Sequence, residues 1–160
     1  FIVLFVLTPS SFSQDQIVYL DLDYVVVNTK AGKSILKELE NSKNIALSKF
    51  EKKGKELKKI EEEINKQKNI ISEDELRKKL IEFRKEVSTY QKNRQTVIND
   101  FNQKKKSEFD KFFKKITPII ENYVNENKID FVLDKKNIFV ASKKKNITQE
   151  IIKIIDSKIK

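Results

Sequence analysis

Lysines and carboxylates are almost the only side chains of this sequence that could do chemistry. Its 160 residues include 34 Lys and Arg and 24 Asp and Glu, but no His and no Cys. Without those two residue types there is no imidazole base, no thiol nucleophile and no zinc site with soft ligands. Gly32 and Gly54 are the only glycines, so a glycine-rich phosphate-binding loop is excluded as well.

Carboxylates gather at two places, residues 61–63 and residues 73–75. Both clusters fall in sequence with a helical pattern, where acidic residues solvate a helix face or complement the positive end of a helix dipole. We interpret both as structural, because the chain has no His beside them and a solvated helix offers no enclosed pocket. We therefore expect no enzyme activity, no metal site and no cofactor.

The positive charge is concentrated in one part of the chain. Residues 30–115 contain 25 Lys and Arg against 15 Asp and Glu, whereas the remainder has nine of each. Lysine solvates a helix, but glutamate would do so equally well, so solvation does not explain the excess. A basic segment attracts acidic partners over about 8 Å in physiological salt. The basic candidates for such binding are Lys49, Lys52, Lys53, Lys59, Lys66, Lys68, Arg77, Lys78, Lys79, Arg84 and Lys85.

Aromatic residues lie in the same basic segment. The candidates for binding are Phe50, Phe83 and Tyr90. Their helical spacing favours packing in a seam between two helices. The second interpretation is that bending of the segment exposes some of these rings to apolar parts of a partner.

Residues 1–13 predict the second half of a secretory signal peptide. An apolar run covers residues 1–7, Pro9 follows, and Ser11 and Ser13 stand at the third and first positions before a cleavage site. We expect cleavage between Ser13 and Gln14, and therefore export. The alternative is an uncleaved membrane anchor. The apolar run would then be only part of that anchor, because a spanning helix needs about 20 apolar residues.

The segment after residue 30 predicts an antiparallel pair of long helices. Apolar residues recur every seven positions from residue 36 to residue 71, with polar interruptions, and a second series begins at residue 76. Between the two series Ser72 and Glu75 form a capping box, which marks a helix start. We expect a helical hairpin over residues 31–116 with its tip near residues 72–75. Pro118 should kink the second helix.

Short strands are predicted on both sides of this hairpin. Residues 16–22 are rich in β-formers and precede a turn of helix at residues 23–29. Residues 129–134 and 137–142 predict two further strands, with Lys135 and Lys136 as the connecting turn.

A last helix is expected after these strands, with Thr148 as its N-cap. The fold class is therefore α+β, mainly α. The hairpin is inserted in a β-containing body formed by residues 14–30 and 117–160.

The predicted body should not be stable alone. Three strands leave two sheet edges unpaired, and small isolated sheets are marginal. We therefore expect self-association that closes the sheet. The residues expected to build this oligomeric body are Val18, Leu20, Leu22, Phe131, Leu133, Ile138 and Val140.

Two stretches beside the predicted hairpin resemble the Skp/OmpH family of periplasmic chaperones. They are VYLDLDYVVVNTKAGK, residues 18–33, and IDFVLDKKNIFVASKKKNITQEIIKIID, residues 129–156. The order of strand, hairpin, two strands and last helix is also that of the family. The chain departs from it at residues 140–142, where the family usually has an aromatic, Ala-Asp-Pro-like run. It also departs at Asn146, where the family usually has Asp.

The resemblance implies a homotrimer whose three helical arms enclose a cavity. It also implies an ATP-independent holdase that carries unfolded outer-membrane proteins in the periplasm. Lipopolysaccharide or an anionic lipid surface would also suit the basic segment.

Two alternatives remain: a passive envelope scaffold or membrane-anchored coiled coil, and a nucleic-acid-binding protein, which the net charge of +10 allows. The signal segment and the lack of any nucleic-acid-reading motif oppose the last, so no nucleic-acid partner is expected.

Overall fold

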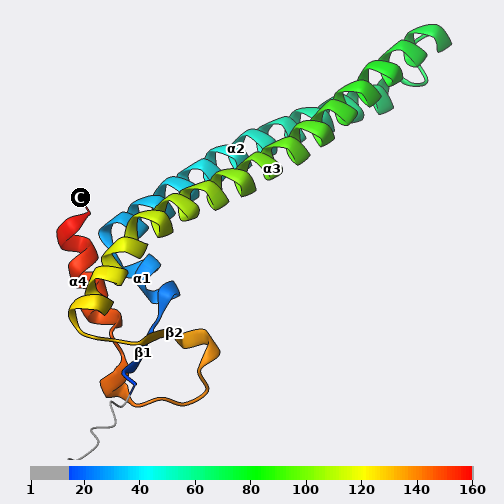
Figure 1. Cartoon of the computed structure of the whole chain (residues 1–160). Helices are drawn as coiled ribbons and strands as arrows, with labels where there is room; N and C mark the ends of the chain where they lie inside the picture. The colour runs from blue at the N-terminus through cyan, green and yellow to red at the C-terminus, as the bar shows by residue number, and fades with distance from the viewer. Residues whose placement is uncertain (1–14, 160) are drawn as a thin grey trace, which may run out of the picture. The chain divides into compact units, whose positions relative to one another are not determined.

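The computed structural model describes residues 15–159, so the predicted signal segment, residues 1–13, lies outside the described residues. The chain forms two compact units, which Figure 1 shows together. We call Ala31–Lys114 the arm, and the described residues on either side of it the body. The structure is mainly helical with one small strand pair, which confirms the predicted class.

The body contains a two-stranded parallel sheet made from distant parts of the chain. β1, Ile17–Leu20, pairs with β2, Phe131–Asp134, so that residue 17 lies opposite residue 131. Gln16 fixes the start of this pairing, because its N–H donates to Asp130 Oδ2 at 2.6 Å. Parallel strands need a long connection, and the sequence of the arm supplies it.

A short helix follows β1 at once because Asp21 caps it. The helix α1, Leu22–Asn28, begins where Asp21 Oδ1 accepts a hydrogen bond from the Tyr24 N–H at 2.9 Å. The predicted helical turn at residues 23–29 is therefore confirmed. The predicted strand of residues 16–22 ends at Leu20, and Leu22, which we expected in that strand, is the first residue of α1.

Three helices supply the core of the body. These are α1, the end of α3, Glu73–Glu126, and α4, Thr148–Lys158. Fully buried side chains come from each of them: Val25, Ile116, Ile151 and Ile155. Burying such a side chain contributes about 1.5–3 kcal/mol, so this cluster is the main apolar support of the body. The helix α3 continues past Pro118 to its end.

Thr148 is buried and connects the start of α4 to the junction of β1 and α1. Its hydroxyl accepts from the Asp21 N–H at 3.0 Å and donates to Asn146 Oδ1 at 2.6 Å. The Thr148 N–H donates to the same Asn146 oxygen at 3.0 Å. The prediction of Thr148 as the N-cap is therefore wrong: the side chain of Asn146 satisfies the first turn, because the Thr148 hydroxyl is engaged by a residue far away in sequence.

Residues 137–142 do not form the predicted third strand. After β2 the chain makes a 3-10 turn, Lys135–Asn137 (η1), and a second one at Lys143–Lys145 (η2). Asp134 starts the first turn, because its Oδ1 accepts from the Lys136 N–H at 3.2 Å and its Oδ2 pairs with the Lys136 ammonium at 2.8 Å. The sheet partner of β2 is β1, so the predicted hairpin is also wrong.

The arm consists of two antiparallel helices, α2, Lys30–Gln67, and the part of α3 that precedes the body (Figure 1). Their contacts show that the two helices are antiparallel, because the residue number falls along α3 as it rises along α2. The contacts join Ser42 to Lys104, Phe50 to Tyr90, Lys53 to Glu86, and Gln67 to Lys79. Ser72 Oγ accepts from the Glu75 N–H at 3.3 Å, which starts α3 as the sequence predicts. The first helix stops at Gln67, short of the predicted residue 71, because the Ile70 N–H turns back to the Gln67 carbonyl.

The arm buries only a narrow stripe of apolar side chains. Leu39, Leu57 and Ile64 of the predicted seam are buried in α2, whereas Lys43 is exposed. On α3 no side chain between residues 73 and 111, a stretch that is fully described, is buried. Few buried contacts mean low local stability, so we expect the arm to open more easily than the body.

Candidate binding groove

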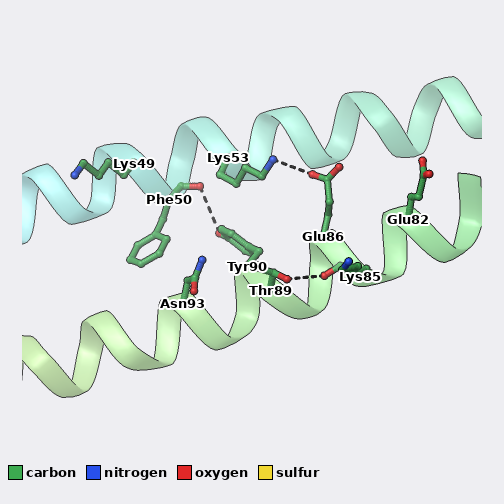
Figure 2. A pocket seen from close by; sticks show the side chains of 9 residues that line it. All are labelled: Lys49, Phe50, Lys53, Glu82, Lys85, Glu86, Thr89, Tyr90 and Asn93. Carbon is green, nitrogen blue, oxygen red and sulfur yellow. Dashed lines mark hydrogen bonds and ion pairs between the residues drawn. The ribbon is translucent and has the colours of Figure 1, made fainter.

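A groove of about 580 Å³ lies between α2 and α3 in the middle of the arm (Figure 2). Its lining from α2 is Lys49, Phe50 and Lys53. The lining from α3 recurs every three or four positions, which places it on one face of that helix. These α3 residues are Glu82, Lys85, Glu86, Thr89, Tyr90 and Asn93.

Two aromatic rings form the apolar part of the groove. Phe50 points from α2 toward α3 and Tyr90 points back, with ring centroids 6.0 Å apart and an interplanar angle of 80° (Figure 2). This edge-to-face arrangement is the one aromatic pairs prefer. The Tyr90 hydroxyl also donates to the Phe50 carbonyl at 3.4 Å. Both side chains are only half-buried, so part of their apolar surface stays accessible.

Lys53 links the two helices beside these rings. Its Nζ lies 2.9 Å from Glu86 Oε2 on α3 and 3.4 Å from Glu56 Oε2 on α2. The hydrogen bond to Glu86 raises the pKa of Lys53 above its ordinary value. The side chains of Lys53 and Glu86 are 42% and 45% exposed, and water screens such a pair. The contact therefore positions the two side chains more than it stabilises the arm.

Lys49 and Lys85 are the two lysines of the groove whose ammonium groups remain available to a ligand. Both are exposed, and within residues 15–159 neither forms an ion pair with a carboxylate. Thr89 Oγ1 donates to the Lys85 carbonyl at 2.9 Å, which leaves the ammonium group of Lys85 open. Glu82 is the one lining carboxylate that no ion pair engages, again within those residues. The groove thus combines an apolar floor with a positive rim.

The other predicted binding residues lie elsewhere on the arm. Phe83 is half-buried and lines a second hollow of about 460 Å³, which Tyr90 also lines. Lys79 Nζ donates to Gln67 Oε1 at 2.7 Å near the tip. The remaining predicted residues are exposed and do not line the groove: Lys52, Lys59, Lys66, Lys68, Arg77, Lys78 and Arg84.

The sequence reasoning missed four residues of the groove. They are Glu82, Glu86, Thr89 and Asn93. Their spacing on one α3 face was visible in the sequence, and it would have placed them beside Tyr90. It does not say which α2 residues they face, because that depends on how the two helices are aligned.

The body exposes apolar side chains around its sheet. Ile17, Phe131 and Leu133 are about half exposed, and Phe139 and Val140 protrude after β2. Within the described part of the chain β2 pairs with β1 alone, so its other edge is open.

The residues predicted to build the oligomeric body divide into two groups. Val18 and Leu20 are buried in the body of the single chain, and Leu22 and Ile138 are half-buried. Phe131, Leu133 and Val140 are exposed. These exposed residues are the ones available to a second copy.

The sequence as a whole matches one known family. The family model described as outer membrane protein (OmpH-like) matches residues 16–155. The chain belongs to the OmpH-like family. The match spans the OmpH-like body and arm alike, and it confirms the resemblance found in the sequence. No curated protein matches this OmpH-like chain.

A solved structure shares the OmpH-like fold. It is a crystal structure from Caulobacter crescentus CB15, described as a candidate outer membrane chaperone of the OmpH-like kind. The TM-score is 0.82 over 98% of this chain and 92% of that one, at 13% sequence identity. At that identity the likeness establishes the fold. Between residues 15 and 159, none of the OmpH-like chain's helices combines the length and apolar content needed to cross a bilayer.

Proposed function

We propose that this OmpH-like protein is an ATP-independent holdase, which binds unfolded outer-membrane proteins in the periplasm and prevents their aggregation. The observation that carries the proposal is the character of the arm. Residues 30–115 carry the whole net charge of the chain, and the arm also presents an accessible aromatic groove. Membership of the OmpH-like family supports the same function.

A basic arm of this kind suits a partner without fixed structure. Strands of outer-membrane barrels alternate apolar and polar side chains, so an unfolded one exposes both. The lysines attract its acidic stretches over about a Debye length, and the half-buried rings of Phe50 and Tyr90 offer apolar contacts. Because each contact is weak, a bound chain can exchange one for another and leave without an energy source.

Self-association into a trimer completes the proposal. The exposed Phe131 and Leu133 and the open edge of β2 support an interface between copies. An open strand edge leaves backbone N–H and C=O groups unpaired, and these can pair with another chain. The number three follows from the resemblance to the Skp/OmpH family, in which three arms enclose the cavity where the unfolded protein is held.

Location and secondary partners belong to the same proposal. Residues 1–13 direct export, so the mature protein acts in the periplasm after cleavage near Ser13. The net positive charge also suits lipopolysaccharide or an anionic lipid surface, as further partners of the arm.

Suppression of aggregation tests the function. A denatured outer-membrane barrel protein is diluted into buffer without ATP, and light scattering is followed with and without this protein. We expect scattering to fall strongly at a few-fold molar excess, and to recover partly at 0.5 M salt because screening weakens the attraction.

An inert basic protein at equal charge concentration, such as lysozyme, is the control. Unchanged scattering at several-fold excess of the OmpH-like protein contradicts the proposal. Suppression that salt does not alter would retain the holdase but remove the role of the charge.

A further inference from the structure

We propose that the groove between α2 and α3 is a subsite for one aromatic side chain of an extended polypeptide, flanked by acidic residues two positions away on either side. The inference rests on the proposed holdase function and names the segment that the arm prefers. Its basis is the combination of Phe50, Tyr90, Lys49 and Lys85 at one place.

The two rings leave room for a third. Phe50 and Tyr90 already lie edge to face, and each is half-buried, so each keeps an accessible ring surface toward the groove. A third ring at 4.5–7 Å from either centroid would extend the same packing. The volume of about 580 Å³ is in the range of sites for small organic groups.

The charges around the rings select the neighbours of that aromatic residue. Lys53 is held by Glu86 at 2.9 Å, so it contributes little attraction. Lys49 on α2 and Lys85 on α3 have no carboxylate partner within the described residues 15–159, and they stand on the two sides of the aromatic floor (Figure 2). Glu82 opposes a wholly acidic ligand, which favours two separate carboxylates over one dense anionic group.

In an extended chain, the second neighbours of an aromatic residue lie on the same side of the backbone as its ring. Side chains two positions apart project from the same side of a strand and are separated by about 6.6 Å. An aromatic residue that enters the groove therefore carries its second neighbours toward the rim. A lipid acyl chain fits less well, because the apolar floor is only two rings long.

Direct binding of a short peptide tests the subsite. The chain has no Trp, so the fluorescence of a peptide such as Gly-Asp-Ser-Trp-Ser-Asp-Gly reports binding without background. We expect a blue-shifted, saturable signal, and about tenfold weaker binding by the double variant Lys49→Gln/Lys85→Gln. The peptide in which Lys replaces both Asp residues should not bind.

A matched double variant, Lys37→Gln/Lys105→Gln, separates this site from general attraction. It removes the same charge from exposed positions, one on each helix of the arm, outside the groove. We expect less than a twofold change. Phe50→Leu keeps an apolar seam residue but removes the ring, and it should abolish the blue shift while the helical circular dichroism is retained.

Three results would overturn the subsite. One is equal weakening by both double variants, which means unspecific charge attraction. Another is an absence of peptide binding by a protein that suppresses aggregation, which removes the subsite and leaves the holdase. The third is displacement of bound peptide by vesicles containing phosphatidylglycerol but not by an excess of the same peptide with Phe in place of Trp, which makes a lipid the occupant. If peptide binds as expected but aggregation is not suppressed, the holdase proposal alone fails.

Discussion

Asp21 uses one carboxylate for two contacts that connect parts of the body. Its Oδ1 caps α1, and its Oδ2 lies 2.8 Å from Lys135 Nζ in the turn after β2. The hydrogen bond from Lys135 is the main cause that lowers the pKa of Asp21 below its usual 3.8, and the Tyr24 N–H adds to the effect. The carboxylate is thus more acidic in the folded chain than in the unfolded one.

The pH dependence follows from that sign. A lowered folded pKa gives stability that is complete above pH 3.8 and is lost as the pH falls through the folded pKa. We expect Asp21→Asn to lower the stability at pH 7 and to lose less of it than the wild type between pH 5 and pH 2. Urea unfolding at each pH measures both.

Asp23→Asn is the matched control for Asp21. Asp23 lies two residues on in the first turn of α1 and is exposed. The Asp23→Asn variant should lose almost as much stability between pH 5 and pH 2 as the wild type does. If Asp21→Asn loses as much stability between pH 5 and pH 2 as the wild type does, groups other than Asp21 cause the acid sensitivity of the body.

At the scale of elements, Gly54 is a weak point in the middle of α2. Glycine in a helix interior costs about 1 kcal/mol relative to alanine. A Cβ at this position would lie 3.6 Å from Tyr90 Oη, which is ordinary van der Waals contact. We therefore expect Gly54→Ala to stabilise the arm by up to about 1 kcal/mol and to raise its unfolding temperature.

Thermal unfolding followed by circular dichroism measures this gain. Ser48→Ala, at an exposed position of the same helix, should give a smaller gain that reflects helix propensity alone. A loss of stability in Gly54→Ala would mean that Tyr90 needs the space next to the glycine.

The elements also show what the sequence could predict. The long helices and the cap at Ser72 depend on local pattern, and they appear where expected except that the first helix ends early, at Gln67. The first strand, expected over residues 16–22, is shorter because Asp21 starts α1. The strand at residues 137–142 failed because a strand needs a partner, and β2 is paired with β1 from the other side of the arm. The prediction of Thr148 as an N-cap was wrong for the same reason, because its hydroxyl accepts a hydrogen bond from Asp21, which is distant in sequence.

The groove was predictable by residue type but not by arrangement. Counting charges and rings pointed to Lys49, Phe50, Lys53, Lys85 and Tyr90 among many other lysines. Only the alignment of α2 against α3 decides which of them meet. The apolar repeat fixes that alignment weakly, because polar residues interrupt the seam.

For the whole molecule the decisive quantity is the number of copies. Because Phe131 and Leu133 are exposed beside an open strand edge, we expect copies to associate, and the resemblance to the Skp/OmpH family sets the expected solution mass at about three times that of the protomer. The variant Phe131→Asp/Leu133→Asp should shift the mass to that of a monomer, since two carboxylates cannot be buried unpaired. Size-exclusion chromatography with light scattering gives the mass directly.

Ile70→Asp is the control for this shift. Ile70 is the most exposed large apolar residue of the arm, and it lies at the tip. Its substitution should leave the mass unchanged. A wild-type protein that is monomeric at all accessible concentrations would remove the trimer and the enclosed cavity from the proposed function.

The parallel pairing of β1 with β2 imposes an order on folding. Residues that meet at the start of the sheet are 114 positions apart, so β1 waits unpaired until nearly the whole chain is available. The two helices of the arm, by contrast, are adjacent in sequence at the tip. They can pair progressively from the tip, because the first contacts join residues that are close in sequence. Once they have done so, the effective loop between the strands is far shorter, and closing it costs less entropy. A chain that emerges from its N-terminus therefore folds its arm before its body. A mutation that slows the pairing of the two arm helices should delay assembly even if the folded protein is equally stable.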